Sequence, residues 1–383
     1  MSFEMPQFAL AAPEIGLAVM VGVVLIADLF DRGQQARLAF VLTQLTLLAS
    51  IGLAMMTHWG SEPTLTFNGM VVSDSLAGLL KAAIAGLAAL TLAYSRDYLR
   101  ERGLLKGEFY LLALIATLGM FVMASAASLL VLYIGLELLS LSLYALVAFD
   151  RDSRAGSESA MKYFILGALA SGMLLYGMSM LYGAAGSLLI SDIAATISAG
   201  DNLLLMSFGM TFALVGVAFK FGAAPFHMWV PDVYQGAPTA VTAFLGSAPK
   251  VAALALFLRL LAEGLGDLHY QWQRMAIIWA VGSLAVGNLF ALVQTNIGLQ
   301  MVVVEGSKKD ENPAYALLEK IIDYKPYNNR EKLETYQYDA YTKVQFDLNN
   351  VDDDLLNAPF VRKFEFLGNY VDTVHEKTSL PVF

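Results

Sequence analysis

Cysteine is absent from the 383-residue chain, and histidine occurs only four times. Without thiols there can be no disulfide, thiolate zinc site, iron–sulfur cluster or cysteine nucleophile. The four histidines are too far apart in sequence for a local metal-binding motif (His58, His227, His269 and His375). No GxGxxG or Walker loop is present either, so the sequence gives no support to nucleotide binding.

Charged residues are scarce and unevenly distributed. Residues 1–300 contain 14 Lys and Arg and 18 Asp and Glu, so about 11% of positions are charged. Residues 301–383 contain 10 and 15, or about 30%, and only two of the 31 glycines. The first part is therefore typical of a polytopic membrane protein and the second of a soluble segment. The net charge of −9 is no indication of nucleic-acid binding.

Long apolar runs dominate the first part of the chain. A bilayer core requires about 20 mostly apolar residues per helix. Nine segments meet this requirement: 10–30, 38–57, 75–94, 109–125, 128–149, 158–184, 204–222, 238–262 and 273–294. The sequence therefore predicts an all-α, polytopic transmembrane bundle of about nine spans, followed by a small soluble α+β tail.

The loops between the spans differ in basic residues. The loops after the first, third and fifth spans contain eight Lys and Arg, whereas those after the second, fourth and sixth contain none. By the positive-inside rule, the basic loops are cytoplasmic and the N-terminus lies outside. The loop 185–203 is too polar to span, and we expect a short helix there on the outer surface. These patterns predict a multi-pass membrane protein.

Three ionisable residues lie where snorkelling to the interface is difficult: Glu137 and Lys250 in mid-span, and Lys220 before a proline-interrupted stretch. A charge at the bilayer centre costs about 2.5–3.5 kcal/mol, so such residues usually face a wet interior and pair with one another. A lysine–carboxylate pair whose charge state responds to its neighbours can relay protons. The alternative is a static ion pair that only fixes helix packing.

Three further basic residues lie closer to span ends. Lys81 and Arg259 are interpreted as side chains that snorkel to the interface. Lys162, five residues into the sixth span, fits snorkelling and the relay equally well.

The stretch 220–236, KFGAAPFHMWVPDVYQG, predicts a broken helix. Pro225 and Pro231 each remove a backbone donor, and glycines flank them. Irregular backbone at membrane depth is tolerated only where it lines protein or a water-filled cavity. His227 lies inside this break and can exchange a proton near neutral pH. Because intramembrane lysines flank it, we favour a functional histidine over a structural one.

At these residues the sequence resembles a known family. The run PFHMWVPDVYQGAPTAVTAFLGSAPKVAA is similar to the signature of the antiporter-like membrane subunit N of respiratory complex I, the proton-pumping NADH:quinone oxidoreductase. Sister subunits and cation/proton antiporters share the FHxWxPD…APT layout, whereas the VYxGAPTxVTAF continuation is typical of subunit N. LYIGLELLSLSLYALVAF and GNLFALVQTNI resemble its fifth and ninth helices, and the resemblance covers about residues 4–297.

The resemblance implies a polar axis halfway across the membrane. Carried over residue by residue, its members are Glu137, Lys162, Lys220 and Lys250, with His227 in the broken region. Redox chemistry in this family takes place on other subunits, so the resemblance implies no cofactor in this chain. The implied partners are other membrane subunits of complex I, the lipid bilayer and protons, and the implied location is the bacterial inner (plasma) membrane.

The resemblance ends near residue 297, where the family continues with five further helices. Residues 298–383 are therefore interpreted as an unrelated polar tail, which leaves a truncated antiporter-like bundle in 1–297. Asn312 and Pro313 predict a helix start in the tail, and YQYDAYTKVQFDLNN predicts a strand. Residues 308–350 loosely resemble a bacterial envelope family with carboxypeptidase-regulatory-like domains. A chimeric join and a natural fusion both remain open.

Three functions remain open at this point. The first is a non-redox, proton-translocating subunit of complex I, coupled to quinone reduction elsewhere in the complex. The second is a subunit of a cation/proton antiporter or a membrane hydrogenase. The third is a non-functional truncated chimera.

Overall fold

A computed structural model describes residues 6–30, 36–58, 62–293, 346–349 and 379–382. Backbone contacts divide the chain into two units, Met1–Glu305 and Gly306–Phe383. In the second unit the structure describes one antiparallel pair, β3 (Phe346–Asn349) and β4 (Ser379–Val382), in which Phe346 lies opposite Val382. β3 lies within the segment 336–350 that is predicted as a strand. The predicted helix near Asn312 lies outside the described residues.

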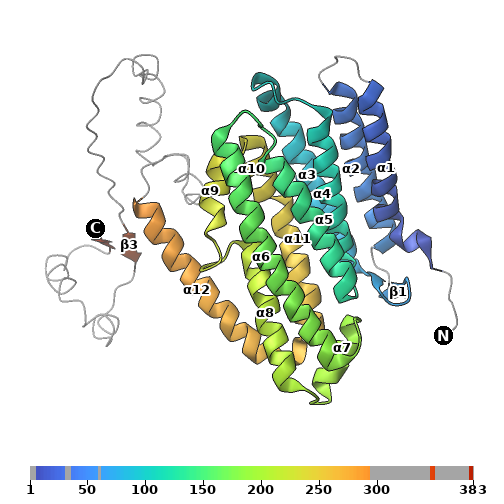
Figure 1. Cartoon of the computed structure of the whole chain (residues 1–383), viewed down its shortest axis with the longest axis vertical. Helices are drawn as coiled ribbons and strands as arrows, with labels where there is room; N and C mark the ends of the chain where they lie inside the picture. The colour runs from blue at the N-terminus through green and yellow to red at the C-terminus, as the bar shows by residue number, and fades with distance from the viewer. Residues whose placement is uncertain (1–5, 31–35, 59–61, 294–345, 350–378, 383) are drawn as a thin grey trace. The chain divides into compact units, whose positions relative to one another are not determined.

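The first unit is a bundle of long apolar helices (Figure 1). Eight segments of the described chain are long and apolar enough to cross a membrane. Seven of them are single helices, the first extended by a 3-10 turn at Phe8–Ala11: α1 (Ala12–Phe30), α2 (Arg37–His58), α3 (Ser75–Glu101), α4 (Gly107–Ala124), α5 (Leu129–Val147), α6 (Arg154–Ala185) and α8 (Leu203–Phe221). The eighth, Thr239–Gly264, is divided into three parts. The predicted all-α membrane bundle is thus confirmed.

The ninth predicted span coincides with α12 (His269–Val293), a 25-residue helix that is not one of those eight. It packs beside the lower part of α8 and diverges from the bundle towards its other end (Figure 1). Contacts from α12 reach the segment between α8 and α9 (Trp229–Gly236). The Ser283 hydroxyl accepts a hydrogen bond of 2.9 Å from the backbone N–H of Ala224.

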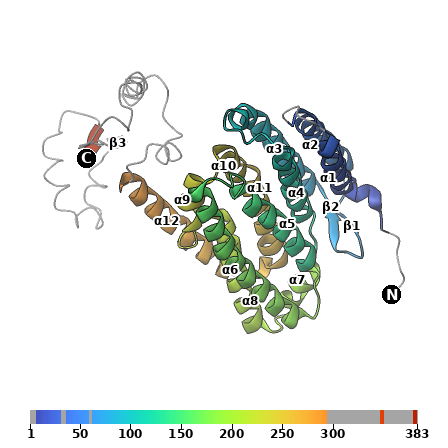
Figure 2. The same ribbon diagram turned by 45° about the horizontal axis from the view of Figure 1, so that its top comes forward.

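The three connections without basic residues meet at one end of the bundle. The connection after α2 forms a hairpin, β1 (Thr64–Thr66) and β2 (Val71–Ser73), and that after α6 contains the short helix α7 (Ile190–Ser198). The backbone N–H of Val72 donates to Ser125, and that of Ile190 to Ala127. Figure 2 shows the hairpin near α1 and α2, and α7 below α5. The short helix predicted in 185–203 is therefore present.

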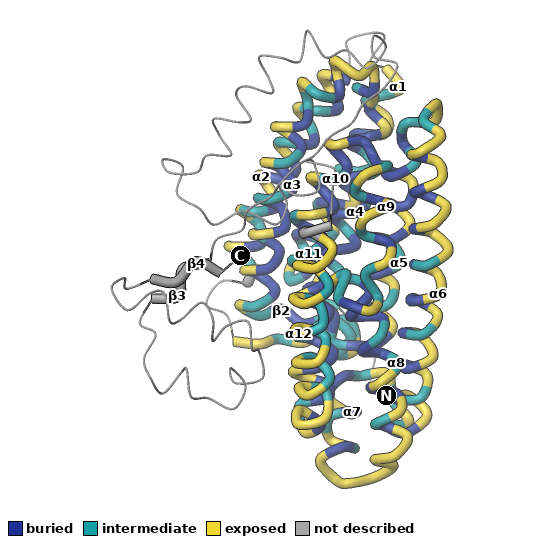
Figure 3. Tube along the Cα trace, turned by 90° about the vertical axis from the view of Figure 1, so that its left-hand side faces the viewer, coloured by how far each residue is buried: buried dark blue, intermediate teal, exposed yellow. Residues whose placement is uncertain are grey.

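Close backbone approach holds neighbouring helices together. A Cβ atom on Gly177 of α6 would lie 2.6 Å from the Gly209 carbonyl oxygen of α8. A Cβ atom on Gly119 of α4 would lie 2.7 Å from the Gly135 carbonyl oxygen of α5. Glycine at these positions lets transmembrane backbones touch, and close packing drives helix association in lipid. The exposed residues of α1, α2 and α6 (yellow in Figure 3) include many large apolar ones.

Two of the spans are interrupted. α8 ends at Gly222, whose φ of 71° is left-handed, and helix resumes only at Trp229. The predicted break between Gly222 and Pro231 is thus confirmed. The eighth span breaks at Ser247, between α10 (Thr239–Gly246) and α11 (Ala248–Phe257), and continues as the π-helix η2 (Leu258–Gly264). Pro249, which has no N–H, follows that second break directly.

Candidate functional site

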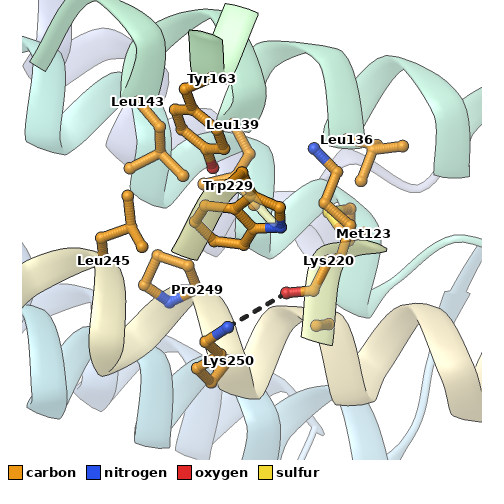
Figure 4. Close-up of a pocket in the computed structure, with 11 residues that line it drawn as sticks. Met123, Leu136, Leu139, Leu143, Tyr163, Lys220, Trp229, Leu245, Pro249 and Lys250 are labelled. Carbon is orange, nitrogen blue, oxygen red and sulfur yellow. Dashed lines mark hydrogen bonds between the residues drawn. The ribbon is translucent and has the colours of Figure 1, made fainter. Parts of the chain in front are cut away.

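The two helix breaks meet at a small cavity inside the bundle. Figure 4 shows two lysines lining it, Lys220 from the last turn of α8 and Lys250 from the first turn of α11. The other lining side chains are apolar or aromatic: Met123, Leu136, Leu139, Leu143, Tyr163, Trp229, Leu245, Pro249 and Ala253. The volume open to the centres of water molecules is about 20 Å³. That is enough for at least one water molecule bonded to the lysines.

Lys250 closes the end of α8. The last four carbonyls of a helix have no partner within it. The Lys250 ammonium donates to the Phe221 carbonyl at 3.0 Å and to the Lys220 carbonyl at 3.3 Å, the bond drawn in Figure 4. The indole N–H of Trp229 donates to the next carbonyl, that of Phe219, at 3.0 Å. The break therefore supplies acceptors at membrane depth, and the site residues occupy them.

Lys220 is held from α5. Its ammonium donates a hydrogen bond of 2.7 Å to the hydroxyl of Ser140, which in turn donates 2.6 Å to the Leu136 carbonyl. Glu137 lies less than one turn before Ser140, and one of its carboxylate oxygens is buried without a hydrogen-bond partner among the described residues. Sequence reasoning missed Ser140, because nothing in the run LELLSLSLYAL distinguishes it from Ser142.

Neither Lys220 nor Lys250 forms the expected ion pair with a carboxylate in the described part of the chain. No carboxylate there lies within the 4.0 Å ion-pair distance of Lys220 or Lys250. The structure nevertheless brings Glu137, Lys220 and Lys250 to one interior region, where a hydroxyl and two carbonyls bind the ammonium groups. Lys250, placed in mid-helix from sequence, begins a helix instead, because Ser247 and Pro249 interrupt the span.

Lys162 and His227 lie away from the cavity lining. The Lys162 side chain is 45% exposed and forms ion pairs of 3.0 Å with Glu158 and with Asp232. His227 lies within the break, as predicted, and its Nδ1 atom is buried without a partner among the described residues. Its ring lies 6.1 Å from that of Phe290 on α12. Their roles in a relay stay predictions.

The snorkelling interpretation of Lys81 and Arg259 is wrong. Lys81 is fully buried and lies 2.5 Å from a carboxylate oxygen of Glu14 on α1. The Arg259 side chain is 1% exposed and pairs with Asp74 at 2.8 Å and with Glu263 at 2.6 Å. Both cations find carboxylates inside the protein, which removes the energetic reason to reach the interface.

A family model described as NADH:quinone oxidoreductase/Mrp antiporter, TM matches residues 126–303. A protein of Alkalilimnicola ehrlichii named NADH-quinone oxidoreductase subunit N is 59% identical over 296 residues, covering 77% of this chain and 60% of that protein. The subunit N of an Azoarcus species is 48% identical over 351 residues, which cover 90% of this chain and 69% of the relative. The chain belongs to the subunit N family of NADH-quinone oxidoreductase. It spans about 60% of the length of the Alkalilimnicola ehrlichii relative.

Solved structures agree with membership of the subunit N family. Respiratory complex I from Thermus thermophilus superimposes with a TM-score of 0.61 at 35% identity, covering 74% of this chain and 58% of that chain. The Mrp complex from a Dietzia species gives the same TM-score at only 21% identity, over 75% and 55% of the two chains, and shares the fold alone. The higher identities of the subunit N relatives favour that family over the antiporter that the sequence left open.

Proposed function

We propose that this chain translocates protons as the subunit N component of a complex I, with quinone reduction on other subunits. The observation that carries the proposal is the cavity shared by Lys220 and Lys250. An amine that gains and loses a proton can pass it to a water molecule in that space, and the second lysine can receive it. Glu137 lies beside the first lysine as a further proton acceptor.

The proposed orientation puts the N-terminus outside the cytoplasm. All three connections without basic residues meet at the end of the bundle that carries β1, β2 and α7. By the positive-inside rule that end is the outer one. The partners in this proposal are other membrane subunits of complex I, and the location is the bacterial inner membrane.

The test is complementation of a bacterial strain whose own gene for subunit N has been deleted. Inverted membrane vesicles from the complemented strain are assayed for NADH oxidation and for proton uptake. We expect the chain to restore uptake and Lys250→Ala to abolish most of it. Lys250→Arg should also impair uptake, because arginine stays charged and cannot release a proton. Glu137→Gln should impair it as well, because the charge that biases the neighbouring lysine is gone.

The matched control is Lys106→Ala, which removes an exposed lysine from the connection before α4. It should leave uptake unchanged. If Lys250→Arg pumps like the unaltered chain at unchanged NADH turnover, Lys250 is a structural charge. If the unaltered chain itself restores no uptake, the interpretation as a non-functional chimera is supported instead.

A further inference from the structure

Every partner of Lys250 in the described chain stabilises a positive charge and none of them can take a proton. Two partners are the carbonyl oxygens at the end of α8. The third is the aromatic face of Trp229, whose ring centroid lies 5.2 Å from the ammonium nitrogen. An indole face attracts a cation through its quadrupole and has no comparable attraction for a neutral amine.

The indole ring of Trp229 is fixed in place. Its side chain is 2% exposed, and its N–H is bound by the Phe219 carbonyl. The Tyr163 ring stacks on it at 4.7 Å with an interplanar angle of 21°, and the Phe219 ring lies at 5.5 Å. The indole ring is held on several sides, whereas Lys250 is a flexible side chain. If the cation–π attraction between them is lost, we therefore expect the lysine to move and the ring to stay.

The second lysine of the cavity has a different environment. Lys220 donates to the Ser140 hydroxyl, and its ammonium lies 5.9 Å from the centroid of the Phe219 ring, not over Trp229. The titratable groups that face Lys250 or its aromatic support are Lys220 from α8, Tyr163 from α6 and Tyr234 from α9. Of the two cavity lysines, only Lys250 therefore has the Trp229 ring face and the free carbonyls at the end of α8 as its partners among the described residues.

We propose that Trp229 is a positioning residue for proton transfer, whose ring face holds Lys250 while it is an ammonium and frees it to turn into the cavity once it is neutral. This inference rests on the proposed function and names the group that controls one of its steps. Lys250 releases its proton to a water molecule in the cavity that it lines, and the loss of charge removes the cation–π attraction and weakens both bonds to the carbonyls. The neutral amine can then turn towards the cavity and accept the next proton.

The test uses the full chain in lipid nanodiscs and needs neither partner subunits nor proton pumping. Trp59, Trp272 and Trp279 are replaced by Phe, so that emission reports Trp229 alone. We expect one alkaline transition in this emission, caused by loss of the Lys250 charge. Lys250→Gln keeps N–H donors for the carbonyls but has no charge, and should abolish the transition. Lys220→Met should keep it with a shifted midpoint.

A second measurement follows Lys250 directly by NMR of the chain with carbon-13-labelled lysine. The signal that disappears in Lys250→Gln is assigned to Lys250. In Trp229→Leu the ammonium form of Lys250 loses the attraction of the ring face, so the pH midpoint of this signal should fall. The typical energy of a desolvated cation–π contact corresponds to a fall of about one pH unit. Trp229→Phe retains a ring face and should restore part of the difference. Unaltered circular dichroism shows that each variant folds.

A transition that persists in Lys250→Gln reports Tyr163 instead and overturns the proposal. The same midpoint in Trp229→Leu as in the unaltered chain also overturns it; if Lys250→Gln does not fold, Lys250→Arg provides the assignment of the lysine signal. A chain that titrates as expected but restores no pumping supports the charge-dependent hold of Trp229 on Lys250 and removes the proposed function.

Discussion

Arg259, in the π-helical end of the eighth span, binds Asp74 ahead of α3 in a bidentate pair. Nη1 lies 2.8 Å from Oδ2 and Nη2 lies 2.8 Å from Oδ1. Asp74 also caps α3 by accepting from the Ala77 N–H at 2.7 Å, and the Arg259 Nε–H donates to the Ala124 carbonyl of α4. One buried cation thus fixes the relative positions of three spans.

Asp74→Asn should destabilise the bundle, because it leaves the Arg259 guanidinium buried without its bidentate partner. Breaking one side of a buried pair costs about 3–5 kcal/mol, which corresponds to a fall in Tm of roughly 10 °C. The measurement is thermal unfolding in detergent. Asparagine retains the side-chain oxygen that caps α3, so loss of the cap does not contribute.

The matched control is Asp97→Asn, which breaks the pair of Arg100 and Asp97 on α3. Those side chains are 55% and 77% exposed, and an exposed pair is worth at most about 1 kcal/mol. Equal losses of Tm in the two variants would show that burial does not strengthen the Arg259 pair.

Lys81 and Glu14 should behave as an energetically coupled pair. Lys81→Met leaves a buried carboxylate and Glu14→Gln leaves a buried ammonium, so each should be strongly destabilising. The double variant removes both charges and should be more stable than the additive sum by about 1–3 kcal/mol. Thermal unfolding is measured for the unaltered chain, the two single variants and the double variant. If the destabilisation of the double variant equals the sum of the two single losses, the buried pair is contradicted.

Gly177→Ala should force α6 and α8 apart, because the added Cβ would lie 2.6 Å from backbone atoms of Gly209 and Ala213. Overpacking of this kind costs about 1–3 kcal/mol. Gly172 lies on the same helix with no heavy atom within 4 Å of its added Cβ. Gly172→Ala should therefore leave thermal stability unchanged or raise it, because alanine is the better helix former.

Ser140→Ala should lower proton uptake in the complementation assay by about tenfold, because the Lys220 ammonium loses a hydrogen bond worth about 1.5 kcal/mol. Ser142 is the control. It is also buried on α5, but its hydroxyl bonds only to the Leu138 carbonyl in the described structure. Similar uptake in Ser140→Ala and Ser142→Ala would remove Ser140 from the pathway.

The spans and the first helix break could be predicted from sequence because both depend on local signals. Apolar run length determines a span, and Gly222 with Pro225 interrupts the backbone without help from other helices. The second break was missed, because Ser247 and Pro249 lie within a continuous apolar run that also suits an uninterrupted helix.

The partners of the charges could not be predicted in this way. Lys81 and Arg259 resemble snorkelling residues because Glu14 and Asp74, which neutralise them, are 67 and 185 positions away in the chain. Ser140 and Trp229 were likewise not identified as ligands of the lysines. Which side chain reaches which ammonium depends on helix rotation and packing, and a single sequence does not encode either as a local pattern.

The bonds from Lys250 to the end of α8 also constrain how such a chain can evolve. A mutation that repairs the break at Gly222 would engage the carbonyls in a helix and leave the ammonium without acceptors. A mutation that removes the lysine would leave two carbonyls unsatisfied in a medium where each costs several kcal/mol. Either change alone is harmful, so the broken helix and its lysine should be inherited together and lost together.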